Sequence, residues 1–376
     1  MPIVSPDDQK VTFVELFFDL VFVFCVTQVA RLLHGHLDLQ SAGSAILVFW
    51  LVWWSWTQYT WALNAANTDH PRIQIVTLLA TALAFLMGVS ILGTFSGGAV
   101  WFAVPYVLVR IVGLLLYYWV AWADPLQRRA VRVFGTFSVV GLSAVMAGAI
   151  LDGNALYWFW GAAILADLMA AGIGGQLDGW NLHPDHFAER HGLIVIIALG
   201  EALIVAAASL ADGSRTPAAI GTAVIAVTVT CGLWWSYFRE ARPSFEHALA
   251  ERTGSARSCT ARDLFSIIHF PMLCGVVAMA AATEVALTHP DQPLASSTRL
   301  ALGGGAALFV CGTAAALWRG GARIATARWI LAPASALAVL VLGATPWVAM
   351  LMILTMLVAV GAVEHRSSIR HPGRYA

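Results

Sequence analysis

Charged side chains inside apolar stretches are the first candidates for chemistry in this sequence. Glu15 and Asp19 are four residues apart in the stretch VELFFDLVFVF. On a helix they would share one face, where two carboxylates repel each other unless one keeps a proton or meets a cation. The alternative is a pair of carboxylates at the start of a helix, solvated in the lipid headgroup layer.

Two further apolar stretches and the region around residue 190 carry more charges. Arg190, which follows Glu189, lies eleven residues before Glu201. Three helical turns separate Arg190 and Glu201, so both follow one stripe of a helix. Arg110 and Asp167 each fall near the middle of an apolar stretch, and we expect them to form an ion pair. Glu201 is the other candidate partner of Arg110, and such a pair either holds the helices together or belongs to the working site.

Histidines are the remaining candidates for proton transfer or metal binding. His269 lies two residues before Pro271, which frees a backbone carbonyl one turn earlier. It is therefore either a proton relay beside a broken helix or a hydrogen-bonded packing residue. His34 and His36 flank a loop with no further ligand nearby, so no metal site is expected. No lysine occurs in an apolar stretch, which excludes a retinal Schiff base, and the sequence leaves the cofactor open.

The composition indicates which solvent surrounds these residues. Of the 376 residues, 59% are hydrophobic and only 11% are charged, with a mean hydropathy of +0.76. Soluble domains have about 25% charged residues, so the solvent of this chain is the lipid bilayer. The formal net charge of zero argues against a nucleic-acid partner.

The elements that position the charges are apolar stretches of about 20 residues, each long enough to cross roughly 30 Å of hydrocarbon. They predict an all-α, polytopic transmembrane bundle of about twelve helices. The gap at 343–346 is short, so 326–363 is either two helices or one broken helix. The longest connection, 239–262, is expected to be a loop that links two halves. The predicted spans are 11–34, 43–63, 72–93, 99–122, 131–150, 155–175, 188–210, 217–238, 263–287, 298–318, 326–342 and 345–363.

The distribution of basic residues supports an even number of spans. With a cytoplasmic N-terminus, seventeen of the 21 lysines and arginines fall on the cytoplasmic side, and only Arg31, Arg215 and Arg299 fall on the other. Cytoplasmic loops carry such an excess of positive charge. We therefore expect a multi-pass membrane protein with both termini in the cytoplasm.

The sequence also contains a weak internal repeat. VELFFDLVFVF at the first predicted helix corresponds to AERHGLIVIIALGEA at the seventh, and WLVWWSW at the second corresponds to GLWWSYF at the eighth. Six helices separate each pair, which predicts two six-helix halves, 1–178 and 179–376. The alternative is a chance recurrence of Trp-Trp-Ser in a tryptophan-rich protein.

Several of these motifs occur in the order found in a known family. VELFFDLVFVFCVTQ, WWSW followed by NAANTDH, AERHGLIVIIALGEALI, LWWSYF and IIHFPMLCGVVAMAAATE together resemble the bacterial low temperature requirement A (LtrA) family. The resemblance implies a multi-pass inner-membrane protein without an established molecular activity. One departure is Arg239-Glu240 where an aspartate is usual. The motif positions carried over by resemblance are Glu15, Asp19, Asp69, Glu189, Arg190, Glu201, His269, Pro271 and Glu284.

These observations favour a transporter or channel for a small solute or ion, coupled to protons through the carboxylates and His269. The alternative is an intramembrane enzyme that acts on a lipid or isoprenoid from the cytoplasmic side. A sensor or a scaffold without chemistry is the third possibility. The substrate and the oligomeric state are not specified by the sequence.

Reporter fusions at the two ends test the predicted topology. Fusions at both the N-terminus and the C-terminus should report a cytoplasmic location, because seventeen basic residues require that side. A periplasmic signal from the C-terminal fusion would contradict the even number of spans.

Overall fold

The computed structural model describes residues 2–6, 8–35, 37–212, 215–321, 326–343 and 345–370, so His36 lies outside the described residues. Within these ranges the secondary structure is helical, apart from an isolated β-bridge between Val4 and Ala66. The predicted all-α class is confirmed. The charged candidates must therefore be positioned by helix packing.

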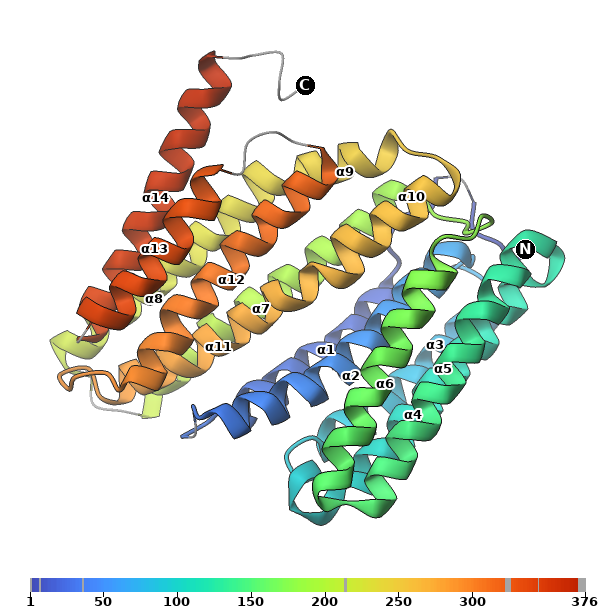
Figure 1. Cartoon of the computed structure of the whole chain (residues 1–376), viewed down its shortest axis with the longest axis horizontal. Helices are drawn as coiled ribbons and strands as arrows, with labels where there is room; N and C mark the ends of the chain where they lie inside the picture. Colours follow the sequence, from blue (N-terminus) through green and yellow to red (C-terminus); the bar gives the residue numbers. More distant parts are fainter. Residues whose placement is uncertain are drawn as a thin grey trace. The chain divides into compact units, whose positions relative to one another are not determined.

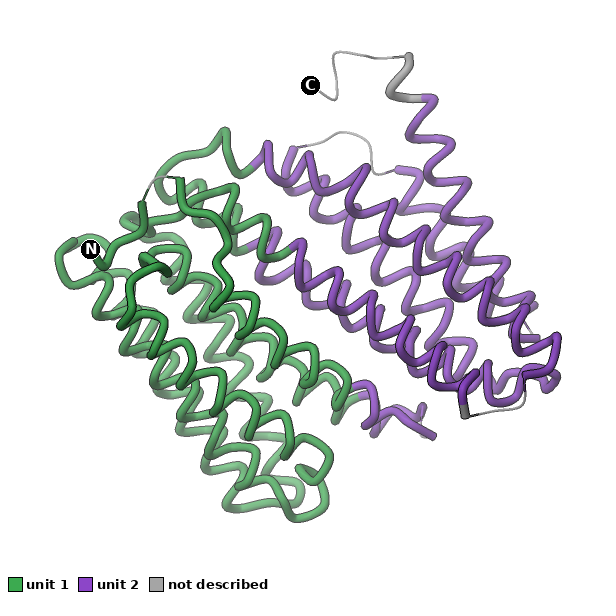
Figure 2. Tube along the Cα trace, turned by 180° about the vertical axis from the view of Figure 1, so that it is seen from behind, with its two compact units in different colours: residues 1–29, 43–191, 249–262 green, residues 30–42, 192–248, 263–376 purple. Residues whose placement is uncertain are grey.

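The chain forms two compact units (Figure 2). The chain passes from one unit to the other after residues 29, 42, 191, 248 and 262. Unit 1 comprises Met1–Val29, Gly43–His191 and Leu249–Arg262, and unit 2 comprises Ala30–Ala42, Gly192–Ala248 and Asp263–Ala376. The six-helix halves expected from the repeat divide the chain differently and remain a prediction.

The helices up to residue 212 supply most of unit 1 (Figure 1). They are α1 (Phe13–Leu32), α2 (Leu39–Ala65), α3 (Pro71–Ser90), η1 (Thr94–Gly98), α4 (Ala99–Val120), η2 (Ala121–Ala123), α5 (Pro125–Leu151), α6 (Gly153–Gly174) and α7 (Pro184–Asp212).

The helices after residue 216 supply most of unit 2. They are α8 (Pro217–Trp235), η3 (Ser236–Ala241), α9 (Arg242–Ala250), α10 (Gly254–Ala261), η4 (Arg262–Ile267), α11 (His269–Thr288), α12 (Ser296–Gly320), α13 (Thr326–Leu342) and α14 (Pro346–Arg370).

The fourteen α-helical elements of the described residues form twelve continuous helices, because π-helical segments join two pairs of neighbouring elements. Through η3, α8 and α9 run on as Pro217–Ala250, and through η4, α10 and α11 run on as Gly254–Thr288. The segment 326–363 is two helices, α13 and α14. Ten helices are long and apolar enough to cross a membrane; α2 and the 17-residue α13 are the other two.

The expected loop over 239–262 is mostly helix. Only residues 251–253, between α9 and α10, are non-helical there. The segment is polar, and polar residues alone do not prevent a helix. In α9, Arg242 and Glu246 form an ion pair of 2.7 Å at the i,i+4 spacing that stabilises an exposed helix.

α2 is the most buried helix of unit 1. Its side chains are covered almost continuously from Ser44 to Ala65, including Trp53 and Trp56. Neighbouring helices therefore shield α2 from lipid, and it tolerates the tryptophans, Gln58 and Asn64 that lower its hydropathy. A helix that would be poorly soluble in lipid becomes the polar centre of its unit.

α11 and α12 of unit 2 pack backbone against backbone. A Cβ atom added to Gly305 would lie 2.5 Å from the carbonyl oxygen of Gly275, and one added to Gly275 would lie 2.4 Å from that of Gly305. Small residues allow membrane helices to approach this closely. By contrast, the nearest neighbour of a Cβ at Gly304 is Leu300 Cδ1, at 3.7 Å.

We therefore expect Gly305→Ala to destabilise the protein by about 1–3 kcal/mol, because the added methyl group forces the two helices apart. The matched control Gly304→Ala adds the same methyl group to the same helix without a clash. Melting temperatures in detergent measure the difference, and equal melting temperatures of the two variants would contradict the close packing.

Candidate functional site

Glu15 closes the first turn of α1 from a completely buried position. Its Oε2 accepts hydrogen bonds from the backbone N–H of Thr12 at 3.0 Å and from the Thr12 hydroxyl at 2.9 Å. This is the backbone half of a capping box, in which the third helical residue reaches back to the N-cap. One oxygen of Glu15 is thus engaged in holding the start of α1.

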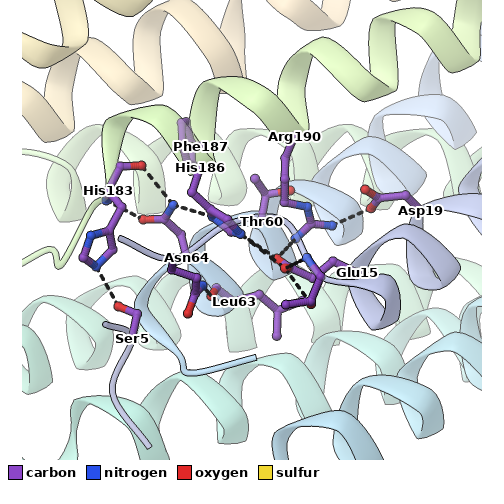
Figure 3. A network of polar contacts seen from close by, with 12 residues as sticks. Ser5, Glu15, Asp19, Thr60, Leu63, Asn64, His183, His186, Phe187 and Arg190 are labelled. Carbon is purple, nitrogen blue, oxygen red and sulfur yellow. Dashed lines mark hydrogen bonds and ion pairs between the residues drawn. The ribbon is translucent and has the colours of Figure 1, made fainter. Parts of the chain in front are cut away.

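His186 on α7 binds the same carboxylate, and Asn64 on α2 holds His186 in place (Figure 3). His186 Nε2 lies 3.0 Å from Glu15 Oε1, and the Asn64 side-chain amide donates to His186 Nδ1 at 2.9 Å. Asn64 is itself fixed by the backbone of His183, with bonds of 2.8 and 3.1 Å. Because Nδ1 accepts, the neutral imidazole carries its proton on Nε2 and donates it to Glu15.

Arg190 connects Glu15 to Asp19 (Figure 3). One end of its guanidinium lies 3.4 Å from Glu15 Oε1, and the other end donates to Asp19 Oδ1. The same Asp19 oxygen accepts from the Trp56 indole at 2.8 Å, and the Trp56 ring lies 5.7 Å from the guanidinium carbon. All these groups are buried, so their interactions are unscreened by water.

Two polar atoms of this cluster have no hydrogen-bond partner among the residues that the structure describes. They are Asp19 Oδ2 and Arg190 Nε, both fully enclosed. With His186 neutral, the cluster holds two carboxylates and a single cation, which gives a net charge of −1. A buried site with an unsatisfied oxygen and an excess negative charge is completed by a proton, a small cation or a polar ligand.

A second buried network in unit 1 is balanced in charge. Arg110 on α4 and Asp167 on α6 lie 3.2 Å apart and are both buried. This is the pair expected from their similar depth. The other polar side chains around the guanidinium are neutral: Gln58, Tyr106 at 2.8 Å and Ser138 at 3.3 Å. One cation facing one anion leaves no charge for a ligand to neutralise, so this network is suited to holding helices together.

α2 contributes to both networks of unit 1. The indole of Trp50 donates to Asp167 at 3.4 Å. Trp50 and Asn64 are the first and last of the four α2 residues that bind these networks. Fourteen residues span about 21 Å of an α-helix, most of the thickness of the hydrocarbon layer. Polar contacts therefore follow α2 through the depth of unit 1: Trp50 to Asp167, Trp56 to Asp19, Gln58 to Arg110 and Asn64 to His186.

The structure does not bring every candidate from the sequence into this site. The side chain of Glu189 is exposed and makes no polar contact with the described residues. Glu201 is buried in unit 2. His269, also in unit 2, lies 2.7 Å from the Leu264 carbonyl oxygen through Nδ1 and 2.8 Å from the Tyr237 hydroxyl through Nε2. Since a carbonyl only accepts, Nδ1 carries a proton and neutral His269 accepts from Tyr237.

Candidates near helix ends also lie outside this cluster. His34 and Glu284, both in unit 2, form a partly exposed pair of 2.8 Å. Asp69 is exposed in the turn before α3. Among the described residues, no three His, Cys, Asp or Glu side chains lie together as a metal site would require.

The sequence indicated the charged residues of this cluster but not the neutral side chains that bind them. His186, Asn64 and Trp56 were not singled out, although Asn64 stands at the end of a tryptophan-rich apolar stretch, where a buried amide needs partners. Polarity at the end of an otherwise apolar run was the signal available for Asn64, whereas His186 lies in the polar segment NLHPDHFAER.

A cluster in unit 2 was missed as well. Arg328 is fully buried and binds Glu364 at 2.7 and 2.8 Å and Glu240 at 3.0 Å. The hydroxyls of Ser236 and Thr313 accept from it at 3.0 and 2.7 Å. Arg328 begins a predicted span, so the sequence indicated a solvated cytoplasmic charge. One of the two carboxylates bound to Arg328 belongs to Glu240, which lies where this sequence departs from the family motif.

Comparison with known proteins gives a family and a relative. The family model for the bacterial low temperature requirement A protein (LtrA) matches residues 10–363. The chain is similar to an uncharacterized protein of Rhizobium meliloti (strain 1021), with 26% identity over 321 residues that cover 82% of this chain and 77% of that protein. No solved structure matches the chain.

A double-mutant cycle tests the ion pair of Arg110 and Asp167. Arg110→Ala strands a buried carboxylate and should cost about 3–5 kcal/mol of stability, and Arg110→Ala with Asp167→Ala should recover part of that loss. Thermal unfolding in detergent measures all four proteins of the cycle. Simple additivity of the two losses would show that the pair does not interact.

Proposed function

The chain belongs to the bacterial low temperature requirement A (LtrA) family of multi-pass membrane proteins, and we propose that it carries a small solute or ion across the membrane in exchange for or together with protons. The proposal places the proton site at the unit 1 cluster of Glu15, Asp19, His186 and Arg190. The observation that carries the proposal is the excess negative charge of this cluster, combined with the buried oxygen Asp19 Oδ2, which accepts no hydrogen bond from the described residues.

The hydrogen bonds of the two carboxylates differ, which supports different roles for them. Glu15 accepts from Thr12, His186 and Arg190, so both of its oxygens are occupied. Asp19 concentrates its two bonds, from Arg190 and Trp56, on Oδ1 and leaves Oδ2 free. We assign the proton to Asp19 Oδ2, whereas Glu15 positions Arg190 and the start of α1. Intramembrane carboxylates commonly serve as proton relays in transporters.

The contacts along α2 support movement through the membrane. An enzyme needs one pocket, whereas a carrier needs polar groups at successive depths. Polar partners extend about 21 Å along α2, from Trp50 to Asn64. Such a series supplies polar groups through most of the hydrocarbon layer.

The second candidate is an intramembrane enzyme that acts on a lipid or isoprenoid. The observation that favours it is the placement of the cluster at one end of its helices. Glu15 is the third residue of α1, His186 the third of α7, and Asn64 the last but one of α2. A site reached from one side only would be built in this way.

Proton flux into liposomes distinguishes the two candidates. The purified protein is reconstituted with a pH-sensitive dye inside, and amino acids, sugars, organic acids and monovalent ions are added outside in turn. We expect at least one class to drive proton movement in the wild type, and Asp19→Asn to reduce it to the rate of protein-free liposomes, because the amide cannot release a proton.

The matched control is Asp185→Asn, which neutralises an exposed carboxylate beside His186 and should leave the flux unchanged. Melting temperatures should be similar for both variants. Flux that Asp19→Asn does not reduce would contradict the assignment. Conversion of an added lipid without any solute-driven flux would favour the enzyme.

A further inference from the structure

Three arginines gather at the start of α5 in unit 1. Arg129 and Arg132 are exposed and Arg128 is half-buried. None of them forms an ion pair with a carboxylate among the residues that the structure describes. The nearby Asp124 caps the helix, accepting from the Leu126 N–H at 2.8 Å. The start of α5 therefore carries a local excess of positive charge that nothing in the described protein neutralises.

Aromatic side chains at the end of α4 and in η2 contact two of these guanidinium groups. Arg128 lies 5.7 Å from the centre of the Trp122 ring and donates to the Trp122 carbonyl at 3.0 Å. Arg132 lies 5.7 Å from the centre of the Tyr118 ring and donates to its hydroxyl at 3.0 Å. Stacking on a ring orients the planar guanidinium and leaves its other N–H groups for an anion.

The turn that carries the arginines is supported from behind. Gly179, in the segment before α7, has a φ of +98°, and a Cβ atom there would lie 2.6 Å from the Gln127 nitrogen. The next residue, Trp180, donates to the Gly174 carbonyl at 2.9 Å. The backbone of this segment thus packs directly against the first turn of α5, and the arginines project from a fixed surface.

We propose that Arg128, Arg129 and Arg132, with Trp122 and Tyr118, form a binding site for the headgroup of an anionic phospholipid. The site lies where two apolar helices, α4 and α5, meet in a short turn. Trp122 is 61% exposed and Leu126 is 58% exposed beside the arginines. Apolar and indole surfaces next to unpaired cations match the boundary between acyl chains and phosphates, whereas a soluble anion would need no apolar neighbours.

Native mass spectrometry of the detergent-solubilised full chain tests the site. Phosphatidylglycerol and phosphatidylcholine with identical acyl chains are titrated separately. The wild type should bind phosphatidylglycerol about tenfold more tightly, and the patch variant with Arg128→Gln, Arg129→Gln and Arg132→Gln should lose that preference. The single variant Arg129→Gln changes a side chain that has no polar contact in the described protein. Its affinity for phosphatidylglycerol should fall about fivefold, which tests the site even if the triple variant fails to fold.

The matched control replaces three other exposed arginines with glutamine: Arg72, Arg239 and Arg366, which form no ion pair with the described residues. It removes the same charge and should keep the preference for phosphatidylglycerol. Equal losses in the two triple variants would mean that only net charge matters and would overturn the site. Displacement of phosphatidylglycerol by inorganic phosphate at the same concentration would show a soluble-anion site and would overturn the assignment to lipid.

Discussion

Arg190 places a guanidinium where no solvent reaches it, and unit 1 is arranged around that charge. A buried cation is stable only with carboxylates in contact, and both of its carboxylates, Glu15 and Asp19, come from one face of α1. The start of α7 is thereby fixed against the start of α1. α2 completes the arrangement, because Trp56 binds Asp19 and Asn64 orients His186. α2 consequently carries polar side chains and is covered almost continuously from Ser44 to Ala65.

Charge balance distinguishes the two buried networks of unit 1. Arg110 faces one carboxylate and three neutral groups, so its network is complete without any ligand. Arg190 faces two carboxylates, and one oxygen stays open. Arg328 in unit 2 also faces two carboxylates, Glu240 and Glu364. In a low-dielectric interior an excess carboxylate is costly, so a cluster of this composition gains a proton or a ligand far more readily than a balanced pair.

The sequence predicted the helical membrane fold and the locations of most buried charges, because apolar length and misplaced polarity are local signals. The pairing of Arg110 with Asp167 followed from their similar depth. The partners of Glu15 and Asp19 did not follow, since Arg190 is 171 residues from Asp19 and contact at that separation depends on tertiary packing. The helical continuation through 239–262 was also missed, because π-helical joints such as η3 have no clear sequence signature.

The protonation of Asp19 is the most direct test of the account. Infrared difference spectra of the wild type and Asp19→Asn, recorded in liposomes over a range of pH, report whether this side chain carries a proton. The account predicts a carboxylic-acid C=O band that Asp19→Asn removes, that disappears as the pH is raised, and that is kept in Glu15→Gln. A band that Glu15→Gln removes and Asp19→Asn keeps, or carboxylate bands alone at every pH, would contradict it.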